Sequence, residues 1–406
     1  MTYVVSALRF RRNFEWGVLT SQWHLWGVDR PVIATVATRG NATLGCLPPS
    51  PLSLDHAFPI LLTSFLAART VETKPVSSRI ANAASMECDK CGRDAVMHAG
   101  YSGAHLCDEH FCASVEKRVR RRIRQDGLVP RDASPEDPER WVVGLSGGKD
   151  SVVLTQILDE TFGQDPRIEI LALTIHEGIE GYRDESVDAC VELADDLDIQ
   201  HELVSYDEEF GIRMDEVVED DPEGMAACAY CGVFRRDLLE TYAEEFDADI
   251  MLTGHNLDDE AQTALMNILE GDVEQMAKHF DASLGPFDER TESEHFVPRA
   301  KPLRDVPEKE VALYAHLRDL PAHITECPHA SEAFRGEIQE LLLKLEDGHP
   351  GTRHSIISGY EELASMAADR YRGESTPEMR ECERCGSQTT RDVCRKCRLL
   401  ESLEAV

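Results

Sequence analysis

Short apolar runs alternate with amphipathic segments through the middle of the chain. The runs are five to eight residues long and contain Val, Ile and Leu, which is typical of strands buried on both faces. The segments between them repeat their apolar positions with helical spacing. This alternation predicts an α/β fold with a doubly wound parallel sheet. The predicted strands are 141–145, 168–175, 200–206 and 249–253, and the predicted helices are 151–162, 184–197, 229–246, 257–270, 307–319, 331–346 and 355–371.

A glycine-rich turn joins the first predicted strand to its helix. Two glycines let the backbone approach an anion, and free N–H groups of the first helical turn point at it. The turn lacks the Gly-Lys-Ser/Thr ending of the Walker loop. Its SGGxDS order is instead typical of enzymes that split ATP between the α and β phosphates, and an ordinary strand–helix turn is the simpler alternative. The predicted phosphate-binding residues are Ser146, Gly147, Gly148, Lys149, Asp150 and Ser151.

A second polar motif, GHNLDDE at 254–260, follows the fourth predicted strand. Doubly wound sheets bind ligands beside the carboxyl ends of their strands, so we expect this motif next to the glycine-rich turn. Asp258 or Asp259 could hold Mg²⁺ together with phosphate oxygens. An acidic helix N-cap has a similar sequence, but the phosphate loop at the same edge favours ligand binding.

The chain is strongly acidic, because its 406 residues include 76 Asp and Glu against 42 Lys and Arg, a formal charge of −34. This composition is typical of a protein adapted to a salt-rich cytoplasm, where dense ions screen the repulsion between carboxylates. Regular apolar periodicity argues against an acidic disordered chain. No stretch reaches the ~18 apolar residues of a membrane span. We therefore expect a cytoplasmic protein with no membrane partner.

Residues 1–85 differ in composition from the rest of the chain. They carry 8 basic and 4 acidic residues, a charge of +4, while the remainder carries −38. They contain three of the four Trp residues and none of the motifs. We expect Met86 to be the true start of the protein, and a genuine N-terminal extension that docks a partner is the alternative.

Eight of the 13 Cys residues form four C-x2-C pairs, a spacing that favours metal sites in a reducing cytosol over disulfides. Two sets have the spacing of structural zinc knuckles, in which four ligands leave no open position. Modules this small fold because metal binding supplies the free energy. A contact with RNA is a second hypothesis for both. The predicted zinc ligands are Cys88, Cys91, Cys107 and His110 in the first module and Cys382, Cys385, Cys394 and Cys397 in the second.

A further pair, Cys228 and Cys231, has no second pair nearby, and Cys327 is its expected partner. Three thiolates can bind an iron–sulfur cluster and leave one iron without a protein ligand, where a small sulfur species can bind. Two alternatives remain open. One is a zinc site completed by His329 or His255, and the other is persulfide chemistry resolved by disulfide exchange.

Basic residues gather in three places. The helical segment 117–124 carries six of them and could bind RNA phosphates by releasing counterions, or it could pair with surrounding carboxylates. Arg235 and Arg236 could meet phosphate or RNA, or form a solvated helix face. The motif KPLR at 301–304 is a further candidate for a cationic contact.

The order of these motifs resembles the tRNA 2-thiouridine synthetases of the TtuA type, which include archaeal and eukaryotic cytosolic wobble-uridine thiolases. The order is knuckle, SGGxDS, central C-x2-C, GHNxDD, lone Cys-Pro and final knuckle, and it covers Met86 to about Cys397. The resemblance implies a PP-loop, HUP-like nucleotide α-hydrolase fold flanked by two zinc modules. The family starts a few residues before the first knuckle cysteine, which supports Met86 as the start.

The resemblance also implies an activity. The C2 oxygen of a tRNA uridine attacks the α-phosphate of Mg²⁺-bound ATP, pyrophosphate departs, and sulfide then attacks C2 and displaces AMP. The implied partners are tRNA, a ubiquitin-like sulfur carrier with a C-terminal thiocarboxylate, and a second copy of the chain in a homodimer. The salt-adapted composition leans towards the wobble uridine.

The residue roles implied by the resemblance follow the motifs. Cys228, Cys231 and Cys327 match the positions that bind a [4Fe–4S] cluster in relatives. With Asp150 they are the implied catalytic residues. The strand at 168–175 is expected to line the adenine pocket through Leu173, Thr174 and Ile175. The implied ATP-binding residues are Ser146, Gly147, Gly148, Lys149, Asp150, Ser151, Thr174, Gly254 and Asp258.

Other functions stay open from the sequence. A different PP-loop enzyme, such as a tRNA cytidine 2-thiolase or a lysidine synthetase, is one alternative, although lysidine synthesis needs no sulfur. A non-catalytic, zinc-dependent RNA-binding protein is another, although it would have no use for an intact SGGxDS loop. The predicted domains are an N-terminal extension at 1–85, a zinc finger with a basic helix at 86–127, the PP-loop catalytic domain at 128–330, a helical region at 331–376 and a second zinc finger at 377–406.

Overall fold

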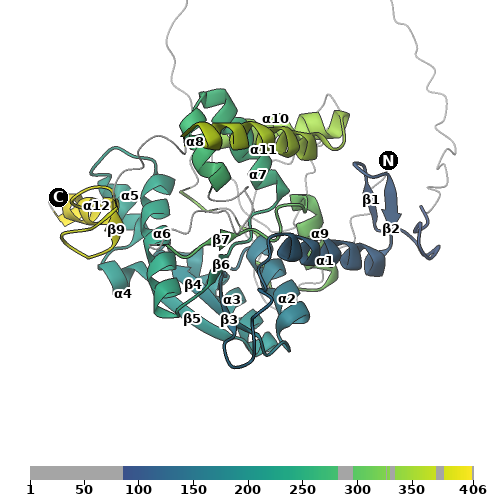
Figure 1. Ribbon diagram of the computed structural model, residues 1–406, viewed down its shortest axis with the longest axis horizontal. Helices are drawn as coiled ribbons and strands as arrows, with labels where there is room; N and C mark the ends of the chain where they lie inside the picture. The colour runs from purple at the N-terminus through teal and green to yellow at the C-terminus, as the bar shows by residue number, and fades with distance from the viewer. Residues whose placement is uncertain (1–85, 282–295, 326, 330–333, 372–378, 405–406) are drawn as a thin grey trace, which may run out of the picture. The chain divides into compact units, whose positions relative to one another are not determined.

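The computed structural model describes residues 86–281, 296–325, 327–329, 334–371 and 379–404. The expectations for residues 1–85, and for the start of the helix at 331–346, lie outside the described residues. A five-stranded sheet has the order β5-β4-β3-β6-β7, every neighbouring pair is parallel, and helices lie on both of its faces (Figure 1). The strands are β3 (Glu139–Gly144), β4 (Ile168–His176), β5 (Gln200–Ser205), β6 (Ile250–Leu252) and β7 (Arg299–Ala300).

The doubly wound α/β fold is confirmed, and the four predicted strands and the helices between them begin and end within two residues of the expected positions. The strand β7 was not predicted, because two residues make no readable apolar run. The helices around the sheet are α1 (Asp108–Gln125), α2 (Lys149–Phe162), α3 (Arg183–Leu197), α4 (Tyr206–Phe210), α5 (Met214–Asp220), α6 (Ala227–Glu245) and α9 (Glu308–Leu317).

Side chains of β3 alternate between two apolar cores, because successive residues of a strand point to opposite faces. Trp141 and Val143 belong to a core formed with α1, α2 and α9. Val142 belongs to a second core that α6 contributes to. All three side chains are fully buried, so this run is apolar without interruption.

The strand order reverses at β3, with β4 and β5 on one side and β6 and β7 on the other. Loops that leave the neighbouring strands of such a reversal run to opposite faces and open a crevice at the carboxyl ends. The SGGxDS turn leaves β3, and the GHNLDDE motif leaves β6. The topology therefore brings the two motifs to one crevice.

Two further groups of elements flank the sheet. One is a helical cluster with its own apolar core, and the other is a C-terminal module whose Leu399 is fully buried in the core beside α6. In the described ranges, no helix is both long and apolar enough to cross a membrane. The remaining elements are β1 (Met97–Ala99), β2 (Ala104–Leu106), α7 (Leu257–Glu270), α8 (Val273–His279), α10 (Phe334–Gly348), α11 (Thr352–Tyr371), β8 (Arg380–Glu381), β9 (Gln388–Thr389) and α12 (Arg395–Glu404).

Glu139, at the start of β3, should make stability depend on pH. Burial, with Asp249 next in effect, raises the pKa of Glu139 from 4.5 to about 7. The folded chain therefore holds a proton that the unfolded chain loses between these values, and stability falls as pH rises through that window. Glu139→Gln should raise the unfolding temperature by a few degrees at pH 8 and leave it unchanged at pH 4. Thermal unfolding at both pH values checks this, and an equal change at both would contradict it.

Candidate functional site

A cavity of about 320 Å³ lies at the crevice between β3 and β6. Ser146, Asp150 and Ser151 line it from the SGGxDS turn, and Gly254 and Asp259 line it from the GHNLDDE motif. Two polar motifs that are about a hundred residues apart in sequence thus share one cavity. This juxtaposition, rather than either motif alone, defines the candidate nucleotide site.

Internal hydrogen bonds hold the SGGxDS turn in place. The Ser146 amide donates to Ser151 Oγ at 3.0 Å, and Ser151 Oγ donates to the Gly148 carbonyl at 3.0 Å. The His323 amide donates to the Gly147 carbonyl at 2.8 Å. Helix α2 begins within the motif, at Lys149. The turn therefore places the positive end of a helix dipole at the cavity before any anion binds.

Two glycines are required by close backbone approaches. Gly147 has φ +78°, and a Cβ there would lie 2.1 Å from the Ser186 carbonyl oxygen. A Cβ on Gly254 would lie 2.9 Å from the amide nitrogen of Ser151. Gly148 is different, because a Cβ would meet only Ser146 Oγ, at 3.6 Å.

Gly147→Ala should lower stability and weaken nucleotide binding together. The left-handed backbone alone costs about 1–2 kcal/mol for an L residue, and the new methyl group clashes with backbone. Gly148→Ala is the matched control and should unfold within about a degree of the parent chain. Thermal unfolding and calorimetric titration with ATP test the pair, and equal stability of the two variants would contradict the expected geometry.

Asp150 joins the two motifs, because its Oδ1 accepts from Asn256 Nδ2 at 2.9 Å. The side chain of Lys149 pairs with two carboxylates: its Nζ lies 2.9 Å from Asp150 Oδ2 and 2.9 Å from Glu308 Oε1. Lys149, Gly147 and Gly148 do not line the cavity in the described structure, whereas Ser146, Asp150 and Ser151 do.

The two acidic candidates of the GHNLDDE motif have different environments. Asp258 is buried, its Oδ1 pairs with Arg353 Nε at 2.8 Å, and its Oδ2 accepts from the Glu308 amide at 2.9 Å. Asp259 lines the cavity, and burial, followed by the charge of Asp150, raises its pKa to about 6. The capping box that starts α7 explains the difference, since it turns consecutive side chains to different sides. Of the two candidates in this motif, Asp259 thus lies at the cavity and Asp258 does not.

The strand β4 contributes alternate residues to the cavity. Leu173 and Ile175 line it, as expected for an adenine pocket. Thr174 does not, because it points to the opposite face, where its hydroxyl donates to the Leu145 carbonyl at 2.8 Å. Thr174 was expected to contact ATP, but the structure places it on the face of β4 that is turned away from the cavity.

The basic segments pair mainly within the chain. In α1, Arg118 contacts Glu310, and Arg122 contacts Asp305 at 2.8 Å. These pairs favour the alternative in which the basic helix binds neighbouring carboxylates instead of RNA. These ion pairs also neutralise positive charge that could otherwise attract a polyanion such as RNA.

The KPLR motif is likewise internal. Arg304 is buried and contacts Glu361, and Lys301 Nζ lies 2.7 Å from Glu260 Oε1. Since a buried charge needs a partner, these contacts are what hold the segment beside α7 and α11. Because both cations are paired with carboxylates, the KPLR motif has little positive charge left to attract an anionic ligand.

The terminal cysteine sets each bring four ligand atoms within 4.8 Å of one another. Cys91 Sγ and Cys107 Sγ are 3.6 Å apart, and Cys385 Sγ and Cys394 Sγ are 3.7 Å apart. Zn–S bonds of about 2.3 Å in a tetrahedron place two sulfurs about 3.8 Å apart. His110 is the fourth member of the first set. Both sets therefore fit a closed, tetrahedral zinc site.

Removal of one exposed ligand from each set should remove one metal ion at a time. Metal analysis of the purified chain is expected to find two zinc ions that are lost singly in Cys91→Ser and Cys385→Ser. Cys112→Ser is the control, because Cys112 is a buried residue of α1, two positions after His110, and is not among the four ligands. A chain that keeps both zinc ions in all three variants would contradict the assignment.

The three central cysteines lie in one neighbourhood. Cys228 and Cys231 are three residues apart on α6 and so share a face of the helix. Burial raises the pKa of the Cys327 thiol, and nearby Cys228 raises it further; Cys327 acts in the same direction on Cys231. The three thiols are spread more widely than either terminal set, since the described residues group only those sets within 4.8 Å. Three spaced thiols suit a cluster better than a single ion.

The histidines expected in a zinc alternative have other partners. His329 Nε2 lies 2.6 Å from Asp215 Oδ1, and His255 Nδ1 lies 2.9 Å from Thr253 Oγ1. Neither joins the three cysteines in a compact four-ligand set among the described residues. This arrangement counts against the zinc alternative at the central site.

Arg235 connects the central cysteines to the cavity. It lines the cavity, and its Nη2 donates to Cys231 Sγ at 3.3 Å. From the sequence, Arg235 was expected to contact phosphate or RNA or to lie on a solvated helix face. No role was predicted from the sequence for Glu177 or Arg183, which also line the cavity. The position of Glu177 directly after β4, at the carboxyl edge of the sheet, was the signal that could have identified it.

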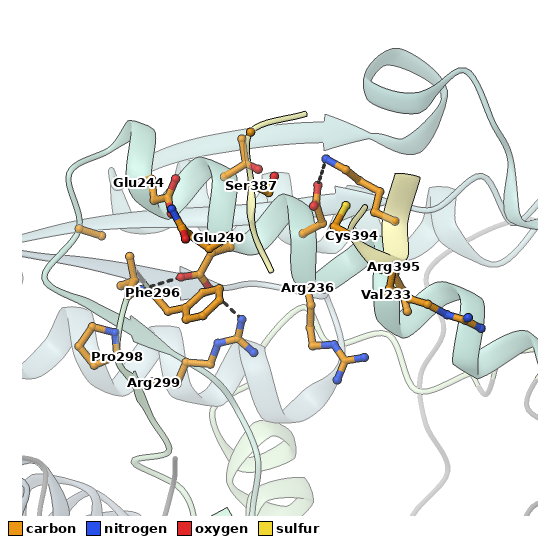
Figure 2. A pocket seen from close by; sticks show the side chains of 17 residues that line it. Val233, Arg236, Glu240, Glu244, Phe296, Pro298, Arg299, Ser387, Cys394 and Arg395 are labelled. Carbon is orange, nitrogen blue, oxygen red and sulfur yellow. Dashed lines mark hydrogen bonds and ion pairs between the residues drawn. The ribbon is translucent and has the colours of Figure 1, made fainter. Parts of the chain in front are cut away.

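A larger cavity, of about 740 Å³, lies between α6 and the C-terminal module (Figure 2). Val233, Arg236 and Glu240 line it from α6, and Cys394 and Arg395 line it from the module. It contains none of the residues of the two polar motifs. The smaller cavity, which residues of the SGGxDS turn line, therefore remains the candidate nucleotide site.

The sheet, the glycine turn and the cavity define a PP-loop nucleotide-binding protein. The PP-loop domain family matches residues 115–336, and the N-terminal LIM domain of 2-thiouridine synthetase TtuA matches residues 87–112. The tRNA 2-thiolation protein NcsA of Haloferax volcanii is 77% identical over 321 residues, which are 79% of this chain and all of the relative. The chain belongs to the PP-loop family of tRNA 2-thiolation proteins.

More distant relatives agree with this membership. Cytoplasmic tRNA 2-thiolation protein 1 of Drosophila pseudoobscura is 36% identical and spans 77% of this chain and 87% of its own length. The solved structure of the U34-tRNA thiolase NcsA from Methanococcus maripaludis with its [4Fe–4S] cluster is 34% identical, with a TM-score of 0.64 over 79% of this chain and 97% of that one.

Proposed function

We propose that this chain is an ATP-dependent tRNA thiolase that replaces the C2 oxygen of the wobble uridine with sulfur. The observation that carries the proposal is that one cavity connects a PP-loop, through Arg235, to three grouped cysteines. Relatives named for tRNA 2-thiolation support the substrate. The thiolase from Methanococcus maripaludis, which is named for U34, supports the wobble position.

The phosphate turn would bind and activate ATP. Amides at the start of α2 and the hydroxyls of Ser146 and Ser151 would hold phosphate oxygens. Asp150 and Asp259 would hold Mg²⁺ between them and the phosphates. The uridine C2 oxygen then attacks the α-phosphorus, the bond to the bridging oxygen breaks, and pyrophosphate leaves. The product is an adenylated uridine whose C2 carries a good leaving group.

The central cysteines would serve the second half of the reaction. A [4Fe–4S] cluster held by Cys228, Cys231 and Cys327 would supply an iron without a protein ligand, at which sulfur can bind. Arg235 lines the cavity and donates to Cys231 Sγ, so sulfide held at the cysteine site would lie near the activated C2. Sulfide attacks C2, the C2–oxygen bond breaks, and AMP departs with the original oxygen.

Other components follow from the family. Zinc ions in the two terminal sets would order the modules that carry them. A ubiquitin-like carrier with a C-terminal thiocarboxylate would donate sulfur, and a homodimer would be the working assembly in the cytoplasm. A tRNA cytidine 2-thiolase is the alternative enzyme, and a non-catalytic RNA-binding protein is the alternative of another class.

The direct test combines the full chain with tRNA, Mg·ATP and sulfide under reducing, anaerobic conditions. We expect tRNA-dependent AMP release and 2-thiouridine at the wobble position, measured by mass spectrometry of nucleosides and of digested fragments. Cys327→Ser should lose iron absorbance and thiolation together, whereas the control Cys112→Ser should keep both. Absence of tRNA-dependent AMP release would exclude the enzyme, 2-thiocytidine would favour the alternative enzyme, and full activity of Cys327→Ser with zinc alone would exclude the cluster.

A further inference from the structure

A buried carboxylate, Glu177, lies between the phosphate turn and the central cysteines. Its side chain is 3% exposed and follows β4 directly. Oε2 lies 2.5 Å from Arg183 Nε, and Oε1 lies 2.6 Å from Arg235 Nη2. One carboxylate therefore holds two guanidinium groups that would otherwise repel each other.

Each arginine extends the connection in a different direction. Arg183 is 4% exposed, and its Nη1 donates to the Ser146 carbonyl of the phosphate turn at 2.7 Å. Arg235 donates to Cys231 Sγ at 3.3 Å. The contacts form one continuous chain from Ser146 through Arg183, Glu177 and Arg235 to Cys231.

The buried charges of this network are expected to lower the stability of the fold or to add little to it. Burying charges costs several kcal/mol per ion, and replacing such a group by apolar side chains is often neutral or stabilising. All four side chains that could sense the nucleotide (Ser146, Glu177, Arg183 and Arg235) line the same cavity. Arg235 is half exposed there, so its remaining N–H groups can meet an anion.

We propose that Glu177 is a positioning residue that couples nucleotide binding to the central cysteine site through Arg183 and Arg235. The carboxylate leaves the two arginines with a net charge of +1, which favours a polyphosphate in the cavity. A bound phosphate draws the free N–H groups of Arg235 towards itself and thereby changes its contact with Cys231. Sulfur chemistry is then tied to the presence of the nucleotide. The purpose of this coupling rests on the proposed function, but the coupling itself does not.

A double-mutant cycle on the full chain tests the coupling. The parent, Glu177→Gln, Cys231→Ser and the double variant are titrated with a non-hydrolysable ATP analogue in the presence of Mg²⁺. Because coupling between two sites is reciprocal, we expect Cys231→Ser to change the dissociation constant about fivefold in the parent and less than twofold in the Glu177→Gln chain. The coupling is calculated from the dissociation constants of the ATP analogue alone, so the measurement does not require thiolation activity.

Two control cycles locate the effect. Glu180→Gln removes an exposed carboxylate of the same loop and should leave the effect of Cys231→Ser unchanged. Cys228→Ser removes a neighbouring thiol, for which the structure shows no hydrogen bond to Arg235, and should couple to Glu177→Gln less than Cys231→Ser does. Arg235→Gln replaces Glu177→Gln if the latter fails to fold, since Arg235 is half exposed.

The outcomes are distinct. Additive effects of Glu177→Gln, or of Arg235→Gln, with Cys231→Ser would overturn the inference, and so would equal coupling of Cys228, because the communication would then not run through this network. A chain that shows the coupling yet makes no 2-thiouridine would leave the inference standing and defeat the proposed function instead.

Discussion

The close approach of the loop after β6 to the start of α2 is the constraint on which the site depends. Gly254 permits it, because any Cβ would collide with the backbone of Asp150 and Ser151. The same approach brings Asn256 to Asp150 Oδ1. Two motifs from distant parts of the chain thus line one cavity, at the N-terminal end of a helix.

Helix α6 performs two tasks on different sides. One side carries Arg235, which lines the smaller cavity, and Cys231, whose Sγ accepts from Arg235 Nη2. Asp237 instead pairs with Lys396 of α12 at 2.7 Å, beside the larger cavity of Figure 2. The C-terminal metal module therefore bears directly on the helix that positions the central cysteines.

Ion pairs hold many of the charged side chains in the described part of the chain. The chain is strongly acidic, yet most of the arginines discussed above contact carboxylates, as Arg118, Arg122 and Arg304 do. Dense salt screens exposed charges within about 10 Å or less but acts weakly on buried pairs. Pairs such as Arg183 with Glu177 consequently keep their strength in a salt-rich solvent, where surface steering of a polyanion would be weak.

The sequence alone determined the alternation of strands and helices, the strand–turn–helix form of the SGGxDS motif and the grouping of the terminal cysteine sets, because each depends on residues close together in the chain. It did not distinguish Asp258 from Asp259 or predict that Thr174 faces away from the cavity, since these depend on which way a cap or strand turns each side chain. Glu177 and Arg183 belong to none of the sequence motifs. Their role exists only after the reversal of strand order at β3 has brought β4, α3 and α6 to the same crevice, where each charge finds its partner.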